Sequence, residues 1–153
     1  MGTRSLTFVY DSYKMNIGKL VHEPIINFYR QYDGYPTGHG AELAEFLTGG
    51  KMTNGLRFGD EGKFFNGMGD LAAQLVAHFK QEAGGFYLYP VTAKDCGQDY
   101  EYHIYNIDGE FKIEVYYCGC NMFGNSGDPE DVEFVFNGSL SEFIEFCKEK
   151  ETA

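Results

Sequence analysis

The segment Tyr100–Tyr117 reads YEYHIYNI-DG-EFKIEVYY, two alternating runs joined by Asp108-Gly109. An Asp-Gly pair between such runs favours a two-residue β-hairpin turn. Pairing Ile107 with Glu110 then fixes the register of strands 100–107 and 110–117. On one face this register pairs Ile104 with Ile113, Tyr102 with Val115, and Tyr100 with Tyr117. On the other face it pairs Tyr105 with Lys112, His103 with Glu114, and Glu101 with Tyr116. One apolar and one polar face are typical of a half-buried antiparallel sheet.

Four further segments have the composition of strands, namely residues 6–10, 25–32, 86–91 and 132–136. In the first of them Leu6, Phe8 and Tyr10 share one face, and Thr7 and Val9 share the other. Residues 51–65 are rich in glycine and are expected to be irregular. An acidic, turn-rich connector is expected at residues 124–131.

Three segments have the pattern of helices. The first covers residues 41–47 and is closed by Gly49-Gly50. The second has an apolar stripe at helical spacing, with Asn66 as its expected N-cap and Gly84-Gly85 as its expected end. The stripe consists of Met68, Leu71, Ala72, Leu75, Val76 and Phe79. The third opens with the capping box Ser139-Leu140-Ser141-Glu142 and is expected to turn Leu140, Phe143, Ile144 and Cys147 inward.

The resulting order of elements is β-β-α-α-β-β-β-β-α. It predicts an α+β fold, with a mostly antiparallel sheet of five to six strands and about three helices on one face. A chain of 153 residues suffices for one core, so we expect residues 1–153 to form a single domain.

The net charge of −11 bears on the choice of partner. It argues against direct binding of nucleic acid or of an anionic membrane, because both depend on basic side chains. It favours a partner with a basic surface, and the simpler interpretation of the charge is solubility. No apolar run is long enough to span a bilayer and the N-terminus lacks a leader pattern, so a cytoplasmic location is expected.

The four cysteines, Cys96, Cys118, Cys120 and Cys147, are expected to be thiols in a cytosolic chain. A zinc site built on Cys118-Gly119-Cys120, with Cys96 or a histidine, would not have the spacing of structural zinc sites. The acidic run at residues 128–131 lacks the spacing of a calcium loop. We therefore expect neither a metal nor another cofactor.

Chemistry-bearing residues concentrate in the segment 29–40, YRQYDGYPTGHG. The candidate binding residues are Tyr29, Arg30, Asp33, Tyr35, Gly38, His39 and Gly40. Arg30 can hold a phosphate or carboxylate in its fork, and N–H groups at a helix start can add donors for an anion. The tyrosines offer rings on which a ligand can stack. The alternative is that the prolines and glycines of this segment only build turns and that Arg30 pairs with a surface acid.

An acid–base role is the remaining alternative for this segment. His39 has the ordinary pKa of a general acid or base, and Asp33 is placed to orient it. This pair would fit a phosphodiesterase-type enzyme. His103 opposite Glu114 is a second candidate acid–base pair, or simply a cross-strand charge pair that stabilises the sheet.

The start Gly2-Thr3-Arg4-Ser5 and the segment 29–40 together resemble a family of small uncharacterised proteins of bacteriophages and bacterial genomes. The resemblance implies an accessory role for a phage or mobile element in the host cytoplasm. It raises antagonism of a host defence component, as in anti-CRISPR-like inhibitors, by stoichiometric binding rather than catalysis. The expected partner is then a basic host protein. A small anionic, nucleotide-like ligand at Arg30 and Gly38–Gly40 is the alternative, and a tyrosine-rich face can also close a homodimer.

Overall fold

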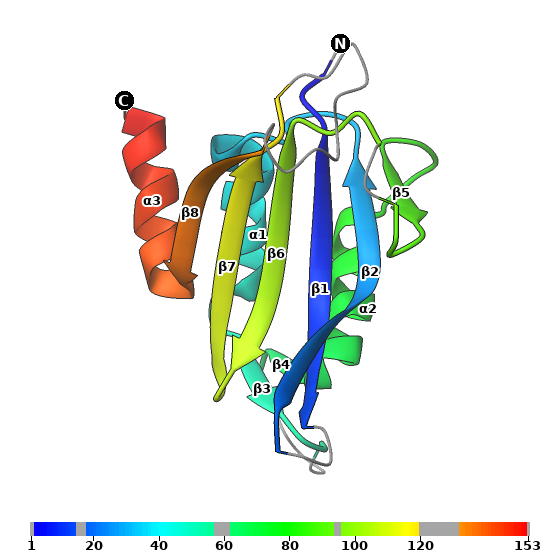
Figure 1. The fold of residues 1–153 in the computed structure, drawn as a ribbon, viewed down its shortest axis with the longest axis vertical. Coiled ribbons are helices and arrows are strands. Elements are labelled where there is room, and N and C mark those ends of the chain that lie inside the picture. The colour runs from blue at the N-terminus through cyan, green and yellow to red at the C-terminus, as the bar shows by residue number, and fades with distance from the viewer. Residues whose placement is uncertain (1, 15–17, 57–61, 94–95, 120–131, 153) are drawn as a thin grey trace.

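The computed structural model describes residues 2–14, 18–56, 62–93, 96–119 and 132–152. Within these residues a six-stranded sheet has the order β5-β2-β1-β6-β7-β8 (Figure 1). Its strands are β1 (Ser5–Lys14), β2 (Leu20–Arg30), β5 (Phe86–Tyr89), β6 (Tyr100–Ile107), β7 (Glu110–Tyr117) and β8 (Glu133–Ser139). Within this six-stranded sheet only the described β1–β6 pairing is parallel, so the predicted mostly antiparallel α+β fold is confirmed.

The hairpin β6–β7 has the predicted register at every pair from Ile107 with Glu110 to Tyr100 with Tyr117. Asp108 and Gly109 have φ angles of 53° and 85°, as a two-residue turn with two positive φ angles requires. Its apolar face lies toward the helices, where Ile104 and Ile113 are buried. The local pattern was therefore sufficient to define this part of the sheet.

The first two strands form a longer hairpin than the sequence predicts. β1 continues beyond Tyr10 to Lys14, and β2 begins at Leu20 rather than Ile25 and ends at Arg30 rather than Tyr32. Backbone pairing between the two strands continues as far as Lys14 and Leu20, and the pairing shifts register between Val9 and Tyr10. Apolar alternation marks only the inner part of such a hairpin, because its outer part covers no core.

The helices are α1 (Ala41–Leu47), α2 (Gly67–Phe79) and α3 (Leu140–Thr152). A single π-helical turn, η1 (Pro36–Gly40), leads directly into α1. The bounds of α1 match the prediction, but α2 ends before Gly84-Gly85, whose φ angles of 80° and 77° instead build the turn into β5. Asn66 precedes α2 without capping it, because its side-chain oxygen accepts a hydrogen bond from Gly55 N (2.6 Å).

The predicted capping box of α3 is confirmed. Ser139 N donates to Glu142 Oε1 (3.0 Å), and Glu142 N donates to Ser139 Oγ (3.3 Å). Phe143 and Cys147 are buried on the inner side of the helix. The cap therefore fixes the point at which the chain leaves β8, and the inner face of α3 closes one end of the core.

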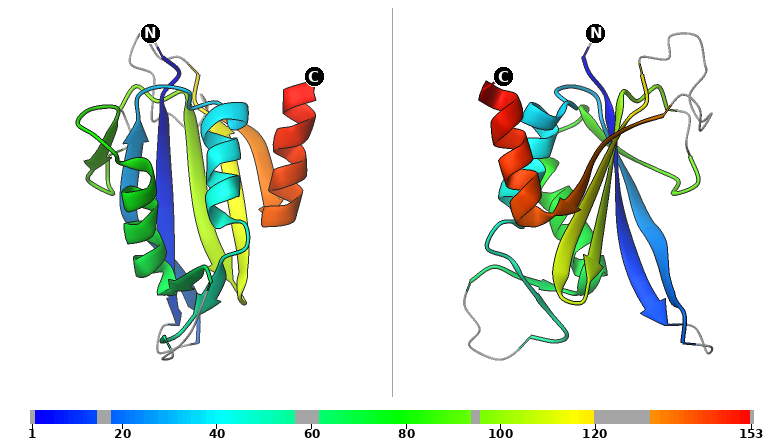
Figure 2. Two further views of the ribbon diagram at one scale, coloured as in Figure 1. Left: turned by 180° about the vertical axis from the view of Figure 1, so that it is seen from behind. Right: turned by 60° about the vertical axis from the view of Figure 1, so that its left-hand side comes forward.

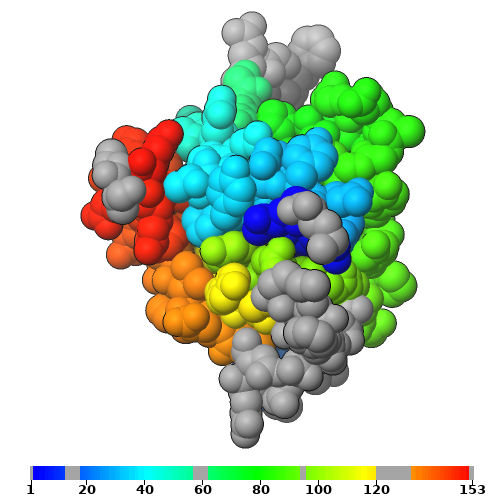
Figure 3. Space-filling model, turned by 90° about the horizontal axis from the view of Figure 1, so that it is seen from above, coloured from blue at the N-terminus to red at the C-terminus, as the bar shows by residue number. Residues whose placement is uncertain are grey.

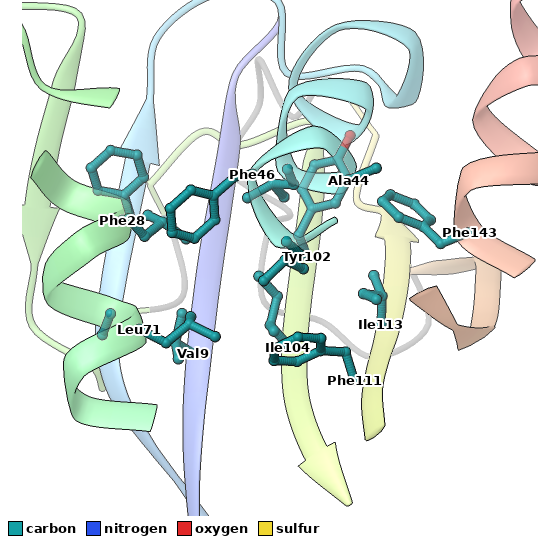
Figure 4. Packing of buried hydrophobic residues seen from close by; sticks show 14 of the residues in the cluster. Val9, Phe28, Ala44, Phe46, Leu71, Tyr102, Ile104, Phe111, Ile113 and Phe143 are labelled. Atoms are coloured by element: carbon teal, nitrogen blue, oxygen red, sulfur yellow. The ribbon is translucent and has the colours of Figure 1, made fainter. Parts of the chain in front are cut away.

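The three helices lie on one side of the sheet, with α3 beside β8 (Figure 2). The main core fills the space between them and the sheet, and Figure 4 shows rings from α1, α3, β2 and β6 converging there. The largest fully buried side chains are Tyr102, Phe28, Phe65, Phe143, Leu6, Leu43, Leu47, Leu71, Leu75, Ile104, Ile113 and His39. Aromatic residues fill much of the core, as a chain with fourteen phenylalanines would suggest.

The other side of the sheet is partly covered by residues 90–93 and 96–99. The Asn27 side-chain amide donates to the carbonyls of Pro90 (3.2 Å) and Ala93 (3.1 Å), which ties this segment to β2. Beneath it Leu6, Phe8 and Tyr29 form a second, smaller cluster of buried residues. The two faces of β1 thus separate as predicted, with Leu6 and Phe8 on one side and Thr7 and Val9 on the other.

The segment 51–65 is more regular than expected. β3 (Lys51–Thr53) and β4 (Phe64–Asn66) pair in parallel as a separate small sheet. Phe65 is fully buried against Phe46 and Phe111 and anchors this sheet to the core. Strands of three residues give too short an alternation to be recognised in the sequence. The expected connector at residues 124–131 lies outside the described residues.

Candidate functional site

The segment 29–40 divides its candidate residues between the two faces of the sheet. Tyr29 belongs to the smaller cluster, where its ring lies 5.0 Å from that of Tyr89. Arg30 points to the opposite face, beneath η1 and α1, because successive side chains of a strand alternate. Tyr29 and Arg30 therefore do not line one site, and Tyr29 is not available to stack on a ligand held by Arg30.

The predicted cradle of N–H groups is not formed. Gly38 N donates to Tyr35 O (2.9 Å), His39 N to Asp33 O (2.7 Å) and Gly40 N to Tyr35 O (3.5 Å). The π-helical turn therefore uses the donors that an anion would need. A Cβ atom at Gly38 would lie 2.5 Å from Asp33 O, so this glycine is required by the close approach of two backbone segments.

His39 is fully buried in a polar contact beneath the turn. Its Nδ1 lies 3.2 Å from Arg30 Nη1, and its Nε2 lies 2.7 Å from Thr7 Oγ1. A guanidinium can only donate, so Nδ1 accepts and the proton of the neutral ring lies on Nε2, which donates to Thr7. Burial and the charge of Arg30 lower the pKa of His39 to about 3.

The predicted pairing of His39 with the carboxylate of Asp33 is wrong. Asp33 Oδ1 accepts a hydrogen bond from the hydroxyl of Tyr35 (3.1 Å), and Asp33 contacts His39 only through its backbone carbonyl. Asp33 has a φ angle of 55°, in the left-handed region that aspartate adopts more readily than most residues. A fully buried imidazole without this carboxylate does not provide the acid–base pair of a phosphodiesterase.

The neutral state of His39 predicts a specific pH dependence. The unfolded chain binds a proton at about pH 6.5 and the folded chain only near pH 3, so stability is lost as the pH falls through this interval. The expected slope is up to about 1.4 kcal/mol per pH unit. Urea unfolding between pH 7 and pH 4 measures it, and His39→Gln should flatten the profile. Parallel profiles for the two proteins would contradict the assignment.

Arg30 is the charged partner of this buried contact. Its side chain is only 5% exposed, and Nη1 also pairs with Glu42 Oε2, whose side chain is 48% exposed. Its guanidinium carbon lies 5.1 Å from the centre of the Tyr32 ring and 5.2 Å from that of Phe86. The guanidinium thus packs between two aromatic rings, which stabilises a cation removed from water. Nε has no hydrogen-bond partner.

A depression in the surface lies at the end of the sheet where the chain leaves β2 and enters β8. It has a volume of about 610 Å³. We call it the tyrosine cleft; it is lined by Tyr35, Pro36, Thr37, Tyr100, Tyr117, Glu133, Phe134, Val135 and Lys150. Figure 3 looks onto this end of the molecule, where η1, the open end of the β6–β7 hairpin, β8 and α3 lie close together.

The cleft contains one predicted site residue, Tyr35, and several that the sequence reasoning missed. The rings of Tyr100 and Tyr117 lie 5.1 Å apart, and Phe134 is 61% exposed. The predicted hairpin register did place Tyr100 opposite Tyr117 at its open end. Their approach to Tyr35 depends on the parallel pairing of β1 with β6, for which the sequence carries no local signal.

The expected pairing of His103 with Glu114 is also wrong, although the two residues are opposite each other in the hairpin. His103 Nε2 lies 3.3 Å from Glu101 Oε1, and its Nδ1 lies 2.7 Å from the hydroxyl of Tyr10. Glu114 instead accepts from the hydroxyl of Tyr116 (2.9 Å). His103 stacks on Phe8 of β1 at 5.1 Å with nearly parallel rings, and it contacts the ring of Tyr116 on β7 edge to face at 5.5 Å.

Glu101, beside His103 on the same face of β6, is held as a carboxylate. Burial raises its pKa, but hydrogen bonds from His103 and Cys118 outweigh this effect and hold the pKa below its usual value. Cys118 Sγ lies 3.1 Å from Glu101 Oε2, and burial raises the pKa of this thiol. A thiol whose pKa is raised is a poor nucleophile, so Cys118 acts here as a hydrogen-bond donor.

No disulfide joins Cys96, Cys118 and Cys147, the cysteines that the structure describes. Within the described residues no three His, Cys, Asp or Glu side chains are arranged to hold a metal ion. Cys120 and the acidic run at residues 128–131 lie outside these residues. No described helix has both the length and the apolar content to cross a bilayer.

Of the candidate site residues, Tyr35 therefore lines the tyrosine cleft, and Arg30 lines a separate cavity. Comparison of the chain with protein-family models, with curated proteins and with solved structures finds no match.

Proposed function

We propose that this protein acts by stoichiometric binding of a basic protein, and that the tyrosine cleft receives a cationic side chain of that partner. The observation that carries the proposal is the cleft itself, an open volume of about 610 Å³ whose lining residues include four aromatic residues, Glu133 and Lys150. Tyrosine and phenylalanine supply much contact area for little loss of side-chain entropy, and they are enriched where proteins bind one another.

The chemistry of the cleft suits an arginine or lysine side chain. Aromatic faces attract a cation, and the carboxylate of Glu133 can pair with it at the edge. Lys150 lines the same cleft, with its Nζ 5.6 Å from the centre of the Phe146 ring on the same helix. The net charge of −11 would also speed the approach of a basic partner and make association sensitive to salt.

The biological part of the proposal is that the captured protein belongs to a host defence system. It rests on the resemblance of residues 2–5 and 29–40 to small phage proteins. The buried His39 removes the one acid–base pair for which segment 29–40 argued, so binding is favoured over a phosphodiesterase activity. Such an inhibitor would work in the host cytoplasm, where it would cover a surface that normally contacts nucleic acid.

The proposal predicts that Phe134→Ala lowers affinity for the captured protein at least tenfold. Phe134 is 61% exposed, so its truncation removes contact area for a partner at little cost to the fold. The effect is measured by capture from bacterial lysate with the wild type, Phe134→Ala and a control variant, followed by titration of the purified captured protein.

Leu88→Ala is the matched control, because Leu88 is 57% exposed on β5, at the other edge of the sheet. The wild type and Leu88→Ala should retain the same basic protein in equimolar amount, with affinity falling as salt rises. Equal capture by Phe134→Ala would show that the cleft is not the binding surface. An affinity indifferent to ionic strength would contradict the electrostatic attraction of a basic partner.

A further inference from the structure

A second cavity, of about 340 Å³, lies beside Arg30 and is separate from the tyrosine cleft. Side chains from β2, α1, α2 and β5 reach it, so four elements far apart in the chain close around one space. The lining residues that matter here are Arg30, Tyr32, Glu42, Glu45, His78 and Phe86. This volume is at the lower end of the range for small-molecule sites.

Arg30 presents a cation with unused hydrogen-bonding capacity. Nη1 is occupied by His39 and Glu42, whereas the buried Nε has no partner. No hydrogen bond joins Nη2 to any residue that the structure describes. A buried N–H of a charged group without a partner is costly and calls for an explanation. Nε and Nη2 form one edge of the guanidinium, with the geometry that binds a carboxylate through two parallel hydrogen bonds.

The opposite charge gathers on α1. Glu42 and Glu45 both line the cavity, three residues apart on the helix, and both are exposed. Glu42 pairs with Arg30, whereas the carboxylate of Glu45 makes no ion pair within the described residues. The cavity therefore holds one guanidinium and two carboxylates. A simple anion would be repelled by Glu45, and a simple cation would leave the edge of Arg30 unmatched.

The remaining walls are aromatic. The rings of Tyr32 and Phe86 lie on the guanidinium, and they contact each other edge to face at 5.8 Å. His78 lies 5.2 Å from the ring of Phe46, and its imidazole adds a flat surface on α2. Such walls bury an apolar or aromatic group but offer little to a sugar or a phosphate chain.

We propose that this cavity binds a free α-amino acid with an apolar or aromatic side chain. The carboxylate of the ligand binds Nε and Nη2 of Arg30, and its ammonium lies between Glu42 and Glu45. Its side chain packs against Phe86 and His78. A zwitterion is the charge pattern that satisfies both ends of the cavity, and this assignment is independent of the proposed capture of a basic protein.

The test compares three probes that share a phenyl ring on a two-carbon chain and differ in their charged groups. L-Phenylalanine carries both charges, phenethylamine lacks the carboxylate and 3-phenylpropionate lacks the ammonium. Calorimetric titration of the wild type should give phenylalanine at least tenfold higher affinity than either of the others. In the nuclear magnetic resonance spectrum, phenylalanine should shift the side-chain N–H resonance of Arg30, since a new acceptor reaches Nε.

Glu45→Gln removes one charge at an exposed position and keeps the shape of the side chain. It should weaken phenylalanine and phenethylamine about tenfold and leave 3-phenylpropionate unweakened. Glu145→Gln, at an exposed position of α3, is the matched control and should change none of the three. Binding of none of the probes, equal affinity for all three, or an unchanged Arg30 resonance at saturation would each overturn the proposal.

Discussion

Tyr102→Ala is expected to lower the free energy of unfolding by about 4 kcal/mol, as for other large aromatic side chains removed from a core. Tyr102 is fully buried on β6, and its ring packs against His39 at 5.2 Å. Its hydroxyl donates to Gly34 O (2.7 Å) and so ties the turn after β2 to the centre of the sheet. The melting temperature should fall by roughly 8–16 °C for a chain of this size.

Tyr102→Phe separates the two contributions of this residue. It keeps the ring and leaves the carbonyl of Gly34 without its donor, which should cost about 1–2 kcal/mol. Urea unfolding of the wild type and both variants gives the comparison. If the two variants were equally destabilised, the hydrogen bond rather than the packing of the ring would hold this part of the fold.

Arg30→Ala should have the second largest effect, a loss of about 3 kcal/mol in the free energy of unfolding. The change removes a cation that packs between Tyr32 and Phe86, and it leaves Nδ1 of the buried His39 without its donor. Thermal and urea unfolding measure the loss. Arg30→Ala is therefore a poor probe of ligand binding, because reduced binding by this variant would also follow from a weakened fold.

Glu42→Gln is the control for Arg30. Glu42 is half exposed, so solvent screens its ion pair with Arg30, and its neutralisation should cost less than about 1 kcal/mol. If Glu42→Gln cost as much as Arg30→Ala, the ion pair would be the dominant interaction of Arg30. A near-neutral Arg30→Ala would instead show that the aromatic rings and His39 rearrange without loss.

The elements that the sequence predicted correctly are those with a local physical cause. The Asp108-Gly109 turn and the alternation on either side of it fix the register of β6–β7. The reciprocal hydrogen bonds of Ser139 and Glu142 start α3. Each signal lies within a few residues of the structure that it specifies, so neither depends on the rest of the chain.

The candidate site was predicted less well, because it depends on contacts between distant residues. The segment 29–40 does carry two side chains that meet, Arg30 and His39, but the contact of His39 with Thr7 follows from the packing of η1 over β1. That packing buries His39 and changes it from a candidate acid–base group into a neutral structural one. Asp33 has the side-chain chemistry to orient an imidazole, but its carboxylate accepts a hydrogen bond from the hydroxyl of Tyr35 instead.

The sequence by itself determined the fold class, the hairpin β6–β7, helix α1 and the start of α3, since patterning and capping act over short distances. Only the tertiary structure decided that β1 and β6 pair in parallel, which brings Tyr100 and Tyr117 toward Tyr35. It also decided which cavity Arg30 shares with Glu45 and Phe86. Parallel pairing and the meeting of helices across a sheet join residues far apart in the chain, and burial of a common core, rather than any local preference, selects those contacts.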